Sequence, residues 1–220
     1  MLLNGEMESL KYTKNNTEVT EEETAPESPI PDLMSMLADD ARMVGLYGEV
    51  NEENCRTLIS HLYSINIMDQ KKIDPSNPED TPVDPIEMLV STEGGAVTEM
   101  FATIDVMNSI KSTCEIHTIG LGKVMSAGIL ILANGTKGKR KVGKYTRLML
   151  HSISGGDFGS IKQLENNIKE VKWYQDNYIK ALVECSNLSS RQLKAIFRKK
   201  SDTYFDAEQA IKWGIADEIV

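Results

Sequence analysis

Cysteine is scarce in this sequence of 220 residues, and long apolar runs are missing. The three cysteines, Cys55, Cys114 and Cys185, lie far apart and form no Cys-x-x-Cys pair, so neither a disulfide framework nor a cysteine zinc site is indicated. No apolar run approaches the roughly 18 residues that a membrane-spanning helix requires. The first residues also lack the basic and apolar segments of a secretory leader. A cytoplasmic location is therefore expected.

A broad excess of basic residues is also absent. The formal net charge is -9, but residues 1–40 carry ten acidic and two basic residues, which leaves residues 41–220 nearly balanced with 23 acidic and 22 basic. A balanced body lacks the electrostatic footprint of a nucleic-acid-binding protein. The zinc-binding His-Glu-x-x-His pattern, the phosphate-binding Gly-x-x-x-x-Gly-Lys-Ser/Thr pattern and the Ser-x-x-Lys pattern do not occur. No metal ion or cofactor is expected.

Composition divides the chain into two parts. Residues 4–31 are rich in Asn, Thr, Glu and Pro, a composition that cannot bury enough apolar surface to offset chain entropy. We therefore predict a disordered acidic arm over residues 1–31 and a single folded domain over residues 32–220, opening with a short helix after Asp32. Four X-Pro pairs also predict a long loop over residues 69–85.

Beyond the arm, apolar strands alternate with amphipathic helices, which predicts a layered α/β fold with right-handed crossovers. The expected strands are 43–47, 88–90, 116–121 and 148–150, and the expected helices contain residues 55–62, 97–110, 129–133, 161–185 and 207–213. In the long helix, apolar residues recur at steps of three and four, and Gln175 alone interrupts them. Such a helix packs either against another subunit or against its own domain.

Three polar residues stand at strand ends, where α/β folds place their sites. Ser126 opens a helix, so its hydroxyl is either a nucleophile near the positive end of the helix dipole or an ordinary N-cap. His151 ends a strand and is placed like a general base, whereas the other two histidines lie inside a helix and a strand. Asp202 could orient the imidazole; its competitor Asp206 is better suited to cap the last helix.

Small residues near the serine could expose the backbone amides that a tetrahedral oxyanion requires. Gly94 and Gly95 follow a strand, and Ala127 follows the serine, although the glycines equally suit a plain turn. The chain order Ser, His, Asp argues against an α/β-hydrolase, as does Val124 at the first glycine position of a Gly-x-Ser-x-Gly elbow.

Several segments together resemble the proteolytic subunit family of the Clp protease over about residues 36–220. They are Glu93–Gly95, Met125–Gly128, Ala133–Arg140, Leu148–His151 and Phe205–Asp217. The resemblance implies a crotonase-like spiral of ββα units with a protruding handle helix, assembled into two stacked seven-membered rings. It also implies a self-compartmentalised serine endopeptidase that receives unfolded polypeptides from an ATP-driven unfoldase of the Clp type.

By this resemblance, each candidate residue has a catalytic role. Ser126 is the nucleophile, His151 the general base and acid, and Asp202 the orienting carboxylate. Gly95 and Ala127 donate their amides to the oxyanion. No cofactor or metal takes part.

The resemblance also implies that substrate binds as an added strand along Gly94, Ala96, Ser152 and Ile153. Two departures from the family motifs fall in this region. Glu93 stands where the family has the proline of Pro-Gly-Gly, and Ser152 and Ile153 replace the Gln-Pro that follows the family's histidine. The strand edges that face substrate are therefore expected to differ from those of the family in shape or in substrate preference.

Two other functions stay open. A catalytically inactive or structural ring subunit would share the fold, although the intact Ser, His, Asp set counts against it. A crotonase-type acyl-CoA enzyme would also use paired backbone amides without requiring that set. Labelling by a serine-directed fluorophosphonate separates the peptidase from the structural subunit, and tight acyl-CoA binding without peptide cleavage would indicate the third function.

Overall fold

The structure is a computed structural model that describes residues 42–73, 76, 83–156, 158–199 and 201–220. These residues belong to one compact unit, Ala41–Val220. The predicted acidic arm and the short helix after Asp32 lie outside the described residues. Within the described part of the chain, no helix is both long and apolar enough to cross a membrane.

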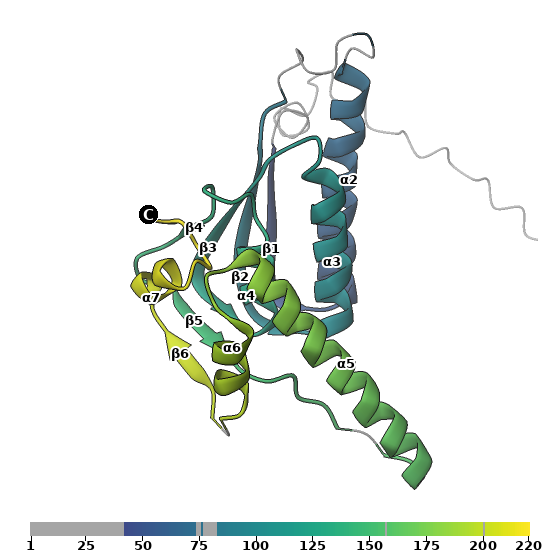
Figure 1. The fold of residues 1–220 in the computed structure, drawn as a ribbon. Helices are drawn as coiled ribbons and strands as arrows, with labels where there is room; N and C mark the ends of the chain where they lie inside the picture. The colour runs from purple at the N-terminus through teal and green to yellow at the C-terminus, as the bar shows by residue number, and fades with distance from the viewer. Residues whose placement is uncertain (1–41, 74–75, 77–82, 157, 200) are drawn as a thin grey trace, which may run out of the picture. The chain divides into compact units, whose positions relative to one another are not determined.

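Strands and helices alternate over residues 43–133, as the apolar pattern predicted (Figure 1). In chain order the elements are β1 Met43–Val50, α2 Glu52–Lys72, β2 Ile86–Gly95, α3 Val97–Ile110, β3 Ile116–Met125, α4 Ala127–Ala133, β4 Lys141–Val142, β5 Arg147–Leu150, α5 Ile161–Cys185, α6 Ser190–Phe197, β6 Thr203–Phe205, α7 Ala207–Lys212 and β7 Glu218–Ile219. The alternation thus runs from β1 to α4, whereas β4 is followed by β5 and α5 by α6.

The strands of the described chain form one sheet, in the order β1-β2-β3-β4-β7, with β5 paired to β3 and β6 paired to β5. All pairs are parallel except β5 with β6. Helices α2 and α3 run side by side along one face of the sheet (Figure 1). Parallel strands joined by covering helices confirm the predicted α/β class.

Helix α4 lies at the centre of the apolar core. All seven of its residues are buried, and it contacts β2, β3, α3 and α5. A helix that is apolar on every side can be stable only when it is enclosed in this way. The residue immediately before it, Ser126, is consequently fixed to a rigid part of the fold.

Helix α2 extends further than predicted. The expected loop was to begin at residue 69, yet α2 continues to Lys72. An ion pair holds this end of the helix: the guanidinium of Arg42 bonds both carboxylate oxygens of Asp69 at 2.7 and 2.8 Å, and Asp69 is buried. Sequence periodicity could not reveal a pair formed between a strand start and a helix end. Residues 74–75 and 77–82 of the expected loop lie outside the described residues.

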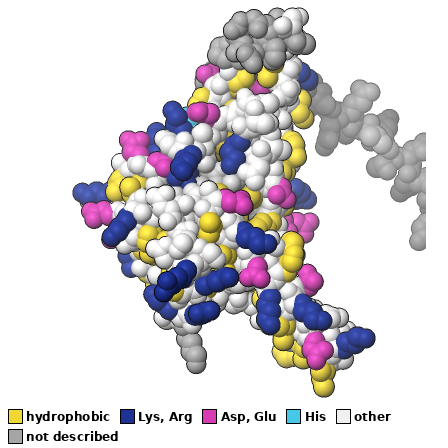
Figure 2. Space-filling model, in the orientation of Figure 1, with side chains coloured by type: hydrophobic (Ala, Val, Ile, Leu, Met, Phe, Trp, Pro, Cys, Tyr) yellow, Lys and Arg dark blue, Asp and Glu magenta, His cyan; other side chains and the backbone are white. Residues whose placement is uncertain are grey.

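Helix α5 is packed along only part of its 25 residues. Its buried residues, Tyr178, Ile179 and Leu182, all lie toward its C-terminal end, which contacts α4 and α6. Toward its N-terminal end, Ile161 and Ile168 are exposed, and Figure 2 shows hydrophobic side chains on the part of this helix that extends away from the sheet. The predicted apolar stripe is thus half covered by its own domain.

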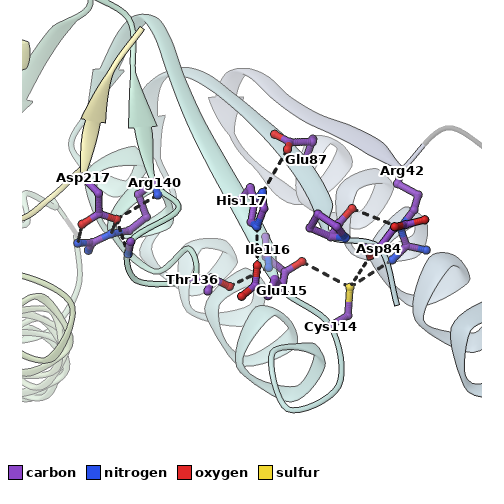
Figure 3. Close-up of polar contacts among 12 residues, drawn as sticks. Arg42, Asp84, Glu87, Cys114, Glu115, Ile116, His117, Thr136, Arg140 and Asp217 are labelled. Carbon is purple, nitrogen blue, oxygen red and sulfur yellow. Dashed lines mark hydrogen bonds and ion pairs between the residues drawn. The ribbon is translucent and has the colours of Figure 1, made fainter. Parts of the chain in front are cut away.

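A buried arginine joins the ends of several elements. Arg140 is only 2% exposed, and its guanidinium bonds both carboxylate oxygens of Asp217 at 2.7 and 2.8 Å (Figure 3). The same group donates to the carbonyls of Ala133, at the end of α4, and Cys185, at the end of α5. The segment after α7 is thereby fixed to the two helices that adjoin the serine.

Replacing Asp217 by alanine should destabilise the protein. The change leaves the Arg140 charge buried without its partner, which costs about 3 kcal/mol, the low end for broken buried pairs because Asp217 is partly exposed. Chemical denaturation measures the loss, with Glu218→Ala, which removes an exposed neighbouring carboxylate, as the control. Equal stability of the two variants would contradict the assigned role of the pair.

The same pair makes the stability of the protein depend on pH in the acid range. Burial alone would raise the pKa of Asp217, but the hydrogen bonds from Arg140 outweigh it and hold the pKa below its ordinary value. A lowered folded-state pKa contributes stability above the unfolded value of about 3.9 and loses it as the pH falls through the folded value. The stability advantage of wild type over Asp217→Ala should therefore shrink below about pH 4.

Candidate active site

Strand pairing places Ser126 beside His151. In the parallel pair β3–β5, Met125 lies opposite Met149, and the N–H of Ser126 donates to the Met149 carbonyl at 2.9 Å. The residues that follow these strands therefore leave the sheet at the same edge. The Oγ of Ser126 lies 2.7 Å from Nε2 of His151, a hydrogen-bonding distance.

The backbone of Ser126 bears on one of its two predicted roles, the ordinary N-cap. It occupies the N-cap position of α4, yet its side chain makes no capping hydrogen bond. Its torsions are φ 53° and ψ -119°, and it is the only non-glycine residue with positive φ among those described. The interpretation as an ordinary N-cap is therefore wrong, because the turn directs the hydroxyl toward the imidazole.

Asp202 reaches His151 through the antiparallel pair β5–β6. Leu150, the last residue of β5, lies opposite Thr203, the first residue of β6. His151, which follows β5, and Asp202, which precedes β6, are therefore neighbours. An Oδ1 of Asp202 lies 3.5 Å from Nδ1 of His151, longer than a hydrogen bond but within ion-pair range. Both side chains are partly exposed, at 45% and 31%.

Asp206 takes the structural role predicted for it. Its carboxylate accepts a hydrogen bond from the N–H of Gln209 at 2.9 Å and so caps α7. Of the two competing carboxylates, Asp202 is the one paired with His151.

Two glycines, Gly94 and Gly95, lie near Ser126. A Cβ on Gly94 would stand 2.6 Å from the Cβ of Ser126, and a Cβ on Gly95 would collide with the carbonyl of Val50. Both glycines also have positive φ, so a side chain is disfavoured here by space and by conformation. On the other side, Ala127 is the first residue of α4, where an N–H has no acceptor within the helix.

A pocket of about 160 Å³ opens beside Ser126 and His151. Its lining combines small residues with larger apolar side chains. The lining residues are Gly95, Ala96, Val97, Met100, Ser126, Ala127, His151, Ile153, Ser154 and Tyr178. Of the residues predicted to face substrate, Ala96 and Ile153 belong to this lining, whereas Gly94 and Ser152 do not.

Three of the predicted substrate-facing residues already use their N–H groups within the chain. The N–H of Gly94 donates to Oγ1 of Thr92 at 2.9 Å, and that of Ala96 donates to a β1 carbonyl at 2.7 Å. The N–H of Ile153 donates to Oε1 of Gln175 at 2.8 Å. Strand addition at these positions remains a prediction, and it would have to use their carbonyl groups.

Glu93, at the position of the family's proline, forms an exposed ion pair. Its Oε2 lies 2.6 Å from Nζ of Lys123, which joins the end of β2 to β3 next to Gly94. The hydrogen bond from Lys123 lowers the pKa of Glu93. The chain next to Gly94 therefore carries an exposed pair of opposite charges.

Other polar clusters near the sheet are structural. His117, predicted to be structural because it lies inside a strand, has its ring nitrogens 3.2 Å from a Glu87 oxygen and 2.7 Å from a Glu115 oxygen (Figure 3). Among the described residues, no three His, Cys, Asp or Glu side chains are grouped so that they could hold a metal ion.

The sequence reasoning missed one buried polar group at this site. Tyr178 belongs to the apolar stripe of α5 and lines the pocket, yet its hydroxyl bonds the carbonyl of Ser126 at 2.8 Å. A tyrosine at a buried stripe position was an available signal, because a buried phenol usually finds a hydrogen-bond partner.

Comparison with known proteins identifies the family of this chain. The model of the Clp protease family matches residues 27–220. A similar protein, ATP-dependent Clp protease proteolytic subunit 2 of Chlamydia pneumoniae, is 29% identical over 86% of this chain and 85% of its own length. Proteins of the same name from Chlamydia trachomatis serovar D and Chlamydia abortus are 28% and 29% identical over 86% of this chain and 85% and 84% of their own. The match includes every described strand and helix, and the chain therefore belongs to the Clp protease family, with that family's crotonase-like α/β fold.

Proposed function

We propose that this protein is a serine endopeptidase, the proteolytic subunit of a Clp-type protease. One observation carries the proposal: the hydroxyl of Ser126 lies 2.7 Å from the imidazole of His151, with the carboxylate of Asp202 on the far side of the ring. Nucleophile, base and orienting acid in this sequence are the parts that peptide-bond cleavage by a serine requires.

The arrangement supports a two-step reaction. His151 Nε2 accepts the proton of the Ser126 hydroxyl while Oγ attacks the scissile carbonyl carbon. Amides of Gly95 and Ala127 would bind the oxygen of the tetrahedral intermediate. The imidazolium then gives its proton to the leaving amine, which leaves an acyl group on Oγ. A water molecule, deprotonated by His151, attacks that ester and releases the second product.

Membership of the family supports a proposal for assembly and partners. Names of the relatives describe ATP-dependent proteolysis, and we propose that this chain likewise receives unfolded polypeptides from an ATP-driven unfoldase of the Clp type in the cytoplasm. We further propose two stacked heptameric rings. Exposed apolar residues on the free part of α5, including Ile161 and Ile168, support a contact between subunits there.

A fluorophosphonate probe tests the catalytic proposal. The purified full-length protein should hydrolyse a fluorogenic peptide and take up one probe on Ser126, located by mass spectrometry, because His151 activates that hydroxyl. The variant Ser154→Ala is the matched control, since Ser154 lines the same pocket and should be dispensable.

Two outcomes would contradict the proposal. Assembled rings that take up no probe would indicate a structural subunit. Tight binding of acyl-CoA without peptide cleavage would indicate a crotonase-type enzyme.

A further inference from the structure

One hydroxyl of helix α5, that of Tyr178, contacts the backbone of Ser126, the proposed nucleophile. Tyr178 is 3% exposed, and its phenol donates to the backbone carbonyl of Ser126 at 2.8 Å. Burial raises the pKa of Tyr178, so the phenol keeps the proton that it donates. Its ring is stacked on Phe197 of α6, with centroids 5.7 Å apart, so packing against α6 helps to hold the direction of the hydroxyl.

The backbone that receives this bond is strained. A side chain at φ 53° occupies a sparsely populated conformation, which persists only where its surroundings impose it. The N–H of Ser126 is held by Met149 of β5, and its carbonyl accepts the N–H of Ile129 at 3.0 Å as well as the Tyr178 hydroxyl. The sheet, α4 and α5 therefore each contribute one hydrogen bond to the turn.

The same helix also holds the segment that follows the base. Gln175 lies three residues before Tyr178, which places both side chains on one face of α5. Its Oε1 accepts the N–H of Ile153, two residues beyond His151. Gln175 is the residue that interrupts the apolar stripe, and this contact gives a physical reason for a polar side chain at that position.

We propose that Tyr178 is a positioning residue, whose hydroxyl holds the Ser126 turn so that Oγ stays within reach of His151. This inference rests on the proposed peptidase function. Tyr178 acts through the backbone of Ser126, so it alters the rate of attack rather than the affinity for peptide. The aromatic ring of Tyr178 has a second role, because it lines the pocket.

The variant Tyr178→Phe isolates the hydroxyl, because phenylalanine retains the ring, its stacking on Phe197 and its place in the pocket lining. Tyr174→Phe is the matched control. It removes a hydroxyl one turn earlier on the same helix, from a ring that stacks against Phe101 and does not line the pocket.

Steady-state hydrolysis of a fluorogenic peptide and the rate of fluorophosphonate labelling are measured on the full-length assembled protein. In Tyr178→Phe, kcat should fall about tenfold, the rate equivalent of one net hydrogen bond. KM should stay within about twofold, and labelling should slow in proportion to kcat while reaching the same final extent. Tyr174→Phe should behave as wild type.

Unchanged kcat in Tyr178→Phe overturns the inference, as does an equal loss in Tyr174→Phe or a change confined to KM. These results leave the peptidase proposal intact, because wild type would still cleave and be labelled. A wild type that neither cleaves peptide nor takes up the probe overturns the peptidase proposal, and the inference with it.

Discussion

Replacing Ser126 by alanine should abolish peptide hydrolysis and leave the fold unchanged. The variant removes the only hydroxyl in contact with the His151 imidazole among the described residues. Since the members of a triad work as a unit, kcat should fall by about 10⁴ to 10⁶. Peptide turnover by the purified variant, measured with excess enzyme, checks the loss.

Stability should hardly change in this variant. The Ser126 side chain makes no capping bond to α4, so alanine removes no cap. Alanine also carries the same Cβ at the same positive φ, and the free energy of unfolding should stay within about 1 kcal/mol of wild type. Retained turnover would remove Ser126 from the proposed role, whereas a loss of assembly would show that the turn has a structural function.

Asp202→Asn should produce the next largest loss of activity. Asparagine keeps the size of the side chain but no longer favours the imidazole tautomer that leaves Nε2 free to accept a proton, so kcat should fall by orders of magnitude, up to about 10⁴. The measurement is kcat for a fluorogenic peptide across neutral pH. Stability should be nearly unchanged, because the Asp202 carboxylate is 45% exposed and exposed pairs contribute about 0–1 kcal/mol.

Asp206→Asn is the matched control for this prediction. Its amide oxygen can still accept the N–H of Gln209, and asparagine caps helices about as well as aspartate. Activity should therefore match wild type. If Asp206→Asn were the damaging change and Asp202→Asn were silent, the assignment of the orienting carboxylate would be wrong.

The elements around the site could be predicted because their apolar patterns are long. The helix Val97–Ile110 has the expected bounds, and β5 ends next to His151 as expected, whereas β3 continues beyond the expected end at Leu121 and stops at Met125, next to Ser126. The capping question could not be settled in the same way, since serine is favoured at an N-cap whatever its side chain later contacts. It required the torsions of the turn.

Other features depend on contacts between distant segments. Strands β4 and β7 have two residues each and are strands only through their pairing, β4 with both β3 and β7, and β7 with β4. Two residues carry no periodicity from which a strand can be predicted. The hydroxyl of Tyr178 likewise meets a carbonyl 52 residues earlier in the chain, a contact that only the packing of α5 on α4 creates.

The residues that line the pocket differ in how freely they could be exchanged. At Gly95 the lining is main chain, and an added side chain would collide with Val50 of β1. Val97, Met100 and Ile153 form a wall of side chains that can be exchanged for others of similar volume. In the proposed peptidase, changes of cleavage preference are therefore open at these three side chains and closed at Gly95, and libraries for redesign should be confined to the former.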